Sequence, residues 1–259
     1  MTQYHYNSKG ELTTADRYLG DDPGFPGTPV DPESFLYQFD DIGNRKLAQR
    51  APNQVGGPTS NINYVPTLLN QYDQIDETVP SVTSTQPAYD LDGNLTDDGN
   101  YAYTWNAENR LIRMTRLTPV DGDVLLEFTY DYIGRRISKA VFTYEQSSAT
   151  YVLQETFLLF YDGWNLIEEQ SYRPTPGNTY TPANYSNFLA NIQTQATEVS
   201  PIYSTHFTWG LDMSDSLQGA GGIGGLLAVS KTAGGFTTHA YPTYDGNGNV
   251  SQYIDEERL

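Results

Sequence analysis

The chain has 259 residues, enough for one large domain or two ordinary ones with a buried core. Its 32 acidic and 14 basic side chains leave a net charge of −18, which excludes a surface built to neutralise nucleic-acid phosphates. The lack of cysteine excludes disulfides and thiol chemistry, and no apolar run reaches the roughly 18–20 residues that span a bilayer. The 21 Tyr, 10 Phe and 3 Trp favour sheets over helical bundles.

The N-terminal part reads as hairpins separated by irregular segments. Residues 4–13 predict strand, turn and strand around Gly10, and the chain opens with neither the charged nor the apolar region of a signal peptide. Prolines and glycines predict a loop over 21–31, and residues 35–49 predict a second hairpin around Gly43. Residues 51–84 are rich in Pro, Asn, Thr and Gln, so we expect irregular structure with short strands there.

From residue 87 to residue 173, short strands alternate with turn signals, which is typical of an antiparallel all-β fold. Residues 174–200 predict an insertion of low order, although weak helical spacing over 184–196 leaves a short helix as an alternative. Residues 201–254 return to strands around glycine-rich turns. No linker or shift in composition divides the chain, so we expect one β region over 1–259 without an independent second domain.

A short frame recurs along the chain and organises it. An aromatic residue is followed by Asp or Asn, two free positions, Gly or Asn, a polar residue and an apolar one. We assign the following residues to these repeat turns: Tyr6, Asn7, Gly10, Phe39, Asp40, Gly43, Tyr89, Asp90, Gly93, Trp105, Asn106, Asn109, Arg110, Tyr130, Asp131, Gly134, Tyr244, Asp245 and Gly248. A shortened relative begins at Tyr161 and Asp162.

The spacing of the frame has a physical reason. A type I turn favours Asp or Asn at its first position and Gly at its fourth, and the next strand of a hairpin follows. Gly takes positive φ without steric cost, and Asn is the usual substitute, so Asn109 can occupy the place that Gly93 occupies in another copy. Each copy is therefore predicted to be the tip of a hairpin, with its aromatic residue in a paired strand.

Motifs for chemistry are weak. The segment GAGGIG at 219–224 matches the dinucleotide pattern, but a strand-like run follows where a helix must begin, so we expect a flexible hairpin turn. The Asp-rich turns at 90–94 and 245–249 resemble calcium loops but carry Leu95 and Val250 where the EF-hand needs Gly. His5, His206 and His239 lack metal-ligand spacing, although folding could join the last two. We assign no catalytic, cofactor-binding or metal-binding residue.

Longer segments resemble a known family. TWNAENRLIRM and YDYIGRRISK are similar to recurrent blocks of the RHS (rearrangement hotspot) or YD-repeat proteins. LLFYDGWNLIEE, FTWGLDMSDSLQGAGGIGGLLAVS and HAYPTYDGNGNVSQYID are similar to segments that lead into the family's conserved core. The resemblance covers roughly residues 34–254 and implies an antiparallel sheet of successive YD-repeat hairpins that curls toward a partial shell or barrel-like wrap.

The resemblance also implies a function and partners. Such shells enclose a toxin or other C-terminal cargo, or serve adhesion at a cell surface, so we expect a non-enzymatic scaffold that is secreted or displayed on a cell. The partners would be other parts of a longer shell or its cargo, with no nucleic acid and no membrane span. The family's DPxGxxxWxD self-cleavage sequence is absent, so no autoproteolytic aspartate is assigned. A carbohydrate-binding or adhesion module that uses exposed tyrosines is the alternative, and a hydrolase in the Asp-rich hairpins lacks a motif.

Overall fold

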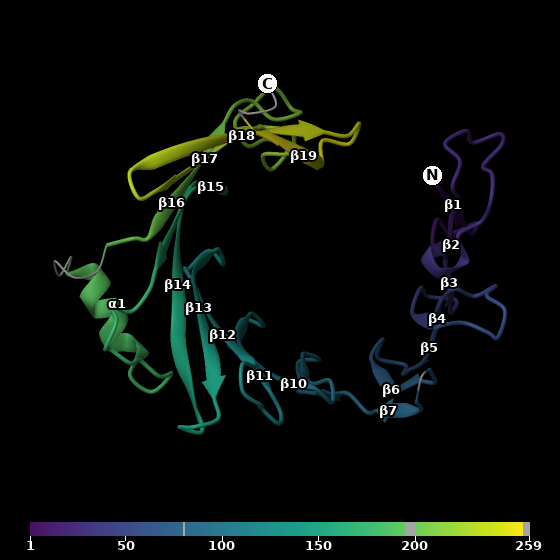
Figure 1. The fold of residues 1–259 in the computed structure, drawn as a ribbon, viewed down its shortest axis with the longest axis horizontal. Helices are drawn as coiled ribbons and strands as arrows, with labels where there is room; N and C mark the ends of the chain where they lie inside the picture. The colour runs from purple at the N-terminus through teal and green to yellow at the C-terminus, as the bar shows by residue number, and fades with distance from the viewer. Residues whose placement is uncertain (80, 195–199, 256–259) are drawn as a thin grey trace. The chain divides into compact units, whose positions relative to one another are not determined.

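The structure is a computed structural model that describes residues 1–79, 81–194 and 200–255. Its strands form two antiparallel sheets, of seven and twelve strands, in which each strand pairs with its neighbours in sequence (Figure 1). The predicted all-β antiparallel fold of successive hairpins is confirmed. The chain divides into two compact units, Met1–Ala102 and Tyr103–Leu259, which are described separately. The expectation of one β region over 1–259 without an independent second domain stays a prediction.

The first sheet is built from short hairpins. Its strands are β1 (Thr2–Tyr6), β2 (Leu12–Arg17), β3 (Phe35–Phe39), β4 (Arg45–Arg50), β5 (Ser60–Pro66), β6 (Tyr72–Glu77) and β7 (Thr83–Thr85). A 3₁₀ turn, η1 (Asp31–Glu33), ends the loop after β2. The range 51–84 is more regular than the sequence predicts, because β5 and β6 pair over five positions.

The second sheet contains the longest strands. It contains β8 (Ala88–Tyr89), β9 (Leu95–Asp97), β10 (Tyr101–Trp105), β11 (Leu111–Arg116), β12 (Val124–Tyr130), β13 (Arg136–Glu145), β14 (Thr150–Asp162), β15 (Asn165–Tyr172), β16 (Tyr203–Trp209), β17 (Leu226–Ala233), β18 (Phe236–Tyr244) and β19 (Val250–Asp255). The sheet order follows the sequence from β8 to β19, so these two strands lie at its open edges.

The predicted low-order insertion over 174–200 contains a helix, α1 (Tyr185–Gln193), so the helical alternative is the one that the structure adopts. Residues 195 and 196 of the range predicted for this helix lie outside the described part. Tyr185, Phe188 and Ile192 are buried because their spacing places them on one face, which packs on the sheet (Figure 1). None of the described helices is long and apolar enough to cross a membrane.

The core of the second unit lies under this helix. Leu125, Ala140, Phe142, Leu153 and Tyr172 cover one face of the sheet and pack against the buried side of α1. The rings of Phe142 and Tyr185 meet edge to face with centroids 5.6 Å apart, a favoured aromatic geometry. In the first unit, only Ala15, Ser34 and Ala51 are buried among the described residues, so that unit depends far more on strand pairing than on a packed interior.

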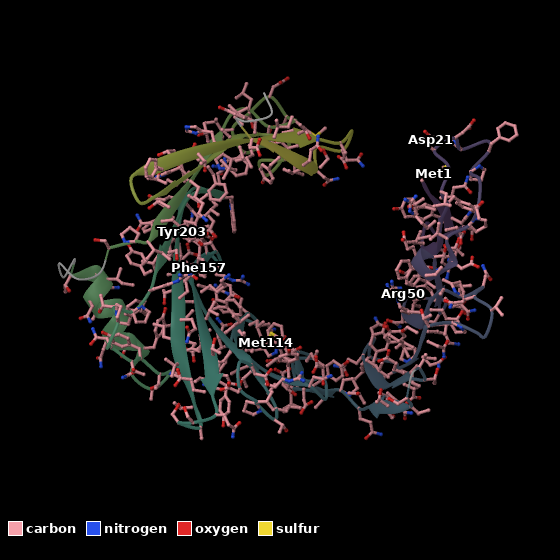
Figure 2. The ribbon with its side chains drawn as sticks, viewed as in Figure 1. Met1, Asp21, Arg50, Met114, Phe157 and Tyr203 are labelled. Atoms are coloured by element: carbon pink, nitrogen blue, oxygen red, sulfur yellow. The ribbon has the colours of Figure 1, made fainter. Side chains whose placement is uncertain are left out.

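The opposite face of the second sheet carries cations over aromatic rings. Strand register places Phe157 beside Ser171 and Ser171 beside Tyr203, all on the face away from α1 (Figure 2). Lys139 Nζ lies 4.2 Å from the Phe157 ring centroid, and Lys231 Nζ lies 3.8 Å from that of Tyr203. Aromatic side chains therefore lie on both faces of this sheet.

Candidate functional site: the repeat turns

The repeat turns of each sheet all lie at the same end of its strands, because they occupy every second connection between consecutive strands. In each standard copy, the amide of the first turn residue donates to the carbonyl four positions on, as Asp131 N does to Arg135 O at 2.9 Å. The amide of the fourth residue donates back to the first carbonyl, as Gly134 N does to Asp131 O at 3.1 Å. These bonds close the hairpin tip.

The Asp or Asn side chain caps the tip from inside. In the copies that begin at Asn7, Asp40, Asp90, Asn106, Asp131 and Asp245, one side-chain oxygen accepts the amides two and four positions on, at 2.8–3.1 Å. The side-chain oxygen thereby satisfies backbone amides of the turn that would otherwise bond only to water. The residue type at this position is therefore dictated by hydrogen bonding.

The fourth position always takes the left-handed conformation. φ is 81° at Gly10, 96° at Gly43, 88° at Gly93, 92° at Gly134 and 78° at Gly248. Asn109 occupies the same place with φ 57°, as the frame predicts for an asparagine. The shortened copy uses Gly163 at φ 56° in a turn of two residues between Asp162 and Asn165.

The structure contains further copies that the frame does not identify. Thr67 caps a turn whose fourth residue, Asn70, has φ 58°, with Leu69 N and Gln71 N donating to Thr67 Oγ1 at 3.2 and 3.3 Å. Asp212 caps another, in which Asp215 has φ 57°. Pro66 and Leu211 precede these turns in place of an aromatic residue, so only the spacing of the cap and the left-handed residue could have identified them.

Asp212 holds the whole glycine-rich connection between β16 and β17. Its carboxylate, 4% exposed, accepts from Ser214 N at 2.9 Å, Ser214 Oγ at 2.6 Å, Ala220 N at 2.6 Å and Gly222 N at 3.2 Å. The bond from Ser214, followed by the backbone amides, outweighs burial and lowers its pKa to about 2. The dinucleotide-like segment thus lies in a hairpin connection, where the amides of Ala220 and Gly222 bind this carboxylate.

A β-bulge accompanies the tips. The register shifts by one residue at Tyr6, Phe39, Pro66, Tyr89, Tyr130, Tyr161, Trp209 and Tyr244, each the residue next to a turn. At Tyr130, for example, the partner changes from Ser138 to Arg136, so that Ile137 is left without a partner in the register. Bulges increase the local twist of a strand pair, so the same increase in twist is repeated beside the tips of both sheets.

The aromatic residue of a tip bonds to the preceding hairpin. Tyr130 Oη donates to Leu111 O at 2.8 Å and Tyr161 Oη to Arg136 O at 2.9 Å, while Tyr244 Oη donates to Leu226 O. Each acceptor is the first residue of a returning strand. The aromatic of the frame therefore connects one hairpin to the next.

The same link has other members. Tyr89 Oη accepts from Tyr72 N at 3.1 Å, and Tyr72 Oη, which the frame does not predict, accepts from Arg45 N at 3.1 Å. Trp209 Nε1 makes the equivalent bond to Leu166 O at 2.7 Å. Tyr6 and Phe39 differ, since Tyr6 is 61% exposed and Phe39 has no hydroxyl.

Polar side chains also join successive tips, forming what we call the tip ladder. In the second unit, Arg110 Nη1 donates to Asp131 O at 2.9 Å, Arg135 Nη1 donates to Gly163 O, and Gln218 Nε2 donates to Asp162 O at 2.8 Å. In the first unit, Lys9 Nζ donates to Asp41 O and Asn44 Nδ2 to Asn70 Oδ1 at 3.3 Å. Within each unit, these bonds join several of the successive tips.

The histidines lie in strands. His206 on β16 pairs in register with Ser230 on β17, which pairs with His239 on β18, so β17 separates the strands that carry the two histidines. The Ser230 hydroxyl lies 2.7 Å from His239 Nδ1. His5 lies 3.8 Å from Asp16. Within residues 1–79, 81–194 and 200–255, no group of three or more His, Cys, Asp and Glu side chains is arranged to hold a metal ion.

Comparison with known proteins places the chain beside long nucleases. No family model matches it. It is 31% identical over 219 residues to the tRNA3(Ser)-specific nuclease WapA of Bacillus spizizenii, which covers 83% of this chain and 8% of that protein. It is also 31% identical over 106 residues to the tRNA nuclease WapA of Bacillus subtilis strain 168, covering 40% of this chain and 4% of that protein. The chain thus spans a small fraction of these relatives, whose names describe their own activity.

Solved structures of toxin proteins are also similar. A TcdB2–TccC3 protein without its hypervariable C-terminal region matches 96% of this chain and 12% of that chain, at 15% identity and a TM-score of 0.47. The Tc holotoxin pore of Photorhabdus luminescens matches 96% of this chain and 15% of that chain, at 16% identity and a TM-score of 0.35.

Valine in place of Gly93 or Gly134 should lower the free energy of unfolding by about 1 kcal/mol or more, because a β-branched residue is strained at their φ values of 88° and 92°. Urea denaturation of each variant measures this. Gly134→Asn should cost less, since Asn109 adopts the same conformation. Gly246→Ala is the control, because its added Cβ meets nothing within 4 Å. Unchanged stability in both valine variants would contradict the turn assignment.

Removing the hydroxyl of Tyr130 should destabilise the second unit by about 0.5–1.5 kcal/mol, the usual net value of one such hydrogen bond. Tyr130→Phe loses the bond to Leu111 O and keeps the ring. Tyr132→Phe is the matched control, because Tyr132 is 91% exposed. Equal unfolding midpoints for the two variants would show that the link between hairpins adds nothing to stability.

Stability should fall as pH is lowered from about 4 toward 2. Hydrogen bonds from Asn44, Asn94 and Asn249 lower the pKa of the capping carboxylates Asp40, Asp90 and Asp245. At Asp131 burial raises the pKa, but the bonds and charge of Arg135 outweigh it and the pKa is lowered.

The sign of this dependence follows from linkage. In the unfolded chain these carboxylates take up protons near pH 3.9, before the folded chain does, so their contribution is complete above that pH and is lost as pH falls through the folded values. Urea denaturation at several pH values measures the slope. Asp245→Asn keeps a capping oxygen and should reduce the slope; an identical slope in that variant would refute this origin.

Proposed function

We propose that the chain is a structural segment of a longer RHS-type β-shell and has no catalytic role of its own. The observation that carries this proposal is the tip ladder together with the aromatic links. Several hairpins bond to the one before them by these two devices, and a repeat architecture extends by such nearest-neighbour contacts. The edge of the second sheet stays open at β19, where a further strand can pair.

The relatives support a role within a larger protein. The chain corresponds to 8% of the length of the Bacillus spizizenii nuclease, and its own acidic charge of −18 opposes contact with a nucleic-acid substrate. We therefore assign any toxic activity to cargo outside this sequence, and we place the shell outside the cell or at its surface. The nuclease in the relatives' names would be such a cargo.

The tyrosines that link the hairpins do not favour the carbohydrate-binding alternative. The hydroxyls of Tyr72, Tyr89, Tyr130, Tyr161 and Tyr244 bond to the backbone of a neighbouring hairpin, so these rings serve packing between repeats. An aromatic platform for a sugar needs its face exposed.

Open edges should make the purified chain associate with itself or adopt an extended form. A compact protein of this length has a radius of gyration near roughly 18 Å, so size-exclusion chromatography with small-angle scattering should show a larger value or concentration-dependent oligomers. Gln252→Lys on the edge strand β19 should reduce association, because an edge lysine opposes strand addition. Gln154→Lys on the inner strand β14, also exposed, is the matched control.

Three results would contradict the proposal. A compact monomer that does not associate would favour an autonomous module over a segment of a shell. Cleavage of tRNA by the purified chain would overturn the absence of catalysis. A glycan array with reproducible binding would restore the alternative.

A further inference from the structure

A half-open cavity of about 590 Å³ lies between the start of α1 and the sheet strands β11 to β13, all in the second unit. Sites for small molecules usually have volumes of about 300–1,000 Å³, apolar walls and a few polar groups. Pro182, Tyr185 and Leu189 supply apolar wall here. Neither the repeat turns nor the tip ladder uses this cavity.

Two opposite charges face each other at the wall. Arg113 and Glu127 are register partners on β11 and β12, and Arg113 Nη1 lies 3.7 Å from Glu127 Oε1. This distance is too long for a hydrogen bond. Among the described residues, neither side chain makes any hydrogen bond, although a guanidinium has five donors and a carboxylate about four acceptor sites.

The pair lies partly inside the cavity wall. Both side chains are partly withdrawn from solvent, with 41% and 24% of their surfaces exposed. Burial raises the pKa of Glu127, and the charge of Arg113 opposes that rise. Hydroxyls of Thr104, Thr129 and Ser138 line the same cavity. The pair therefore keeps hydrogen-bonding capacity that water or a ligand must satisfy.

We propose that this cavity binds a small zwitterion with an apolar side chain, namely a bulky α-amino acid. Its carboxylate would accept from Arg113 and its ammonium group would donate to Glu127, while its side chain would pack on Pro182, Tyr185 and Leu189. The two charges of an α-amino acid lie side by side, as the two wall charges do. This inference goes beyond the scaffold role and does not depend on it.

The charge pair also determines which ligands are rejected. A ligand with only a carboxylate reaches Arg113 but approaches the like charge of Glu127. A ligand with only an ammonium group meets the reverse problem. Because the two wall charges are 3.7 Å apart, neither single-charge ligand can avoid the second one.

Three probes of nearly equal shape test the inference on the full chain. These are L-phenylalanine, phenethylamine, which lacks the carboxylate, and 3-phenylpropanoate, which lacks the ammonium group. Titration followed by amide chemical shifts should show L-phenylalanine binding about tenfold or more tightly than either analogue, the value of one charge-assisted hydrogen bond. The shifts should centre on β11, β12 and the start of α1. Equal affinity for all three probes, or binding by none, would overturn the proposal.

Variants separate the two charges. Glu127→Gln should make L-phenylalanine and 3-phenylpropanoate bind alike, and Arg113→Gln should make L-phenylalanine and phenethylamine bind alike. The double exchange Arg113→Glu with Glu127→Arg should restore the preference for the zwitterion. Arg116→Gln is the control. Arg116 lies on β11, as Arg113 does, but it pairs with Asp123 and does not line the cavity. A preference that survives Glu127→Gln or Arg113→Gln would refute the assignment.

Discussion

The capped turn with a left-handed fourth residue is the constraint on which the rest of this structure depends. It reverses the chain within a few residues, and its Asp or Asn oxygen satisfies amides that an exposed tip would otherwise leave open. The turn also determines where the returning strand begins, and a bulge follows at once. That position decides which carbonyl the next aromatic hydroxyl can reach. One local rule thus generates both the hairpin and its attachment to the following hairpin.

The connections at the two ends of the strands differ in each sheet. At the end with the repeat turns, polar side chains bridge successive tips, so an insertion there would break the tip ladder. At the other end of the strands, connections range from Gly234 and Gly235 alone to residues 173–202 with their helix. The entropic cost of closing a loop rises only slowly with its length, so these connections tolerate insertions. The second unit uses its largest addition to build a core, because α1 covers an apolar face that the hairpins alone would leave open.

Stability in such a protein is distributed along the chain. The first unit buries few side chains, and hydrogen bonds of the strands and tips make up for the small interior. Where each repeat contacts mainly its neighbours, a sequence can match a small part of a much longer relative, as this chain matches the WapA nucleases. The acidic surface keeps the charge of the whole chain strongly negative, while the cations sit on rings, in ion pairs or at tips.

A left-handed residue and its capping oxygen are local requirements of each tip, and residue types such as those of Asp131 and Gly134 meet them. The all-β class and the position of most tips could therefore be predicted from the sequence. It missed the turns at Thr67 and Asp212, where the aromatic that marks the other copies is replaced. Only the tertiary structure decided what lies between tips. The aromatic links, the helix over Phe142 and the pairing of Arg113 with Glu127 depend on register between strands, and register cannot be read from one strand at a time.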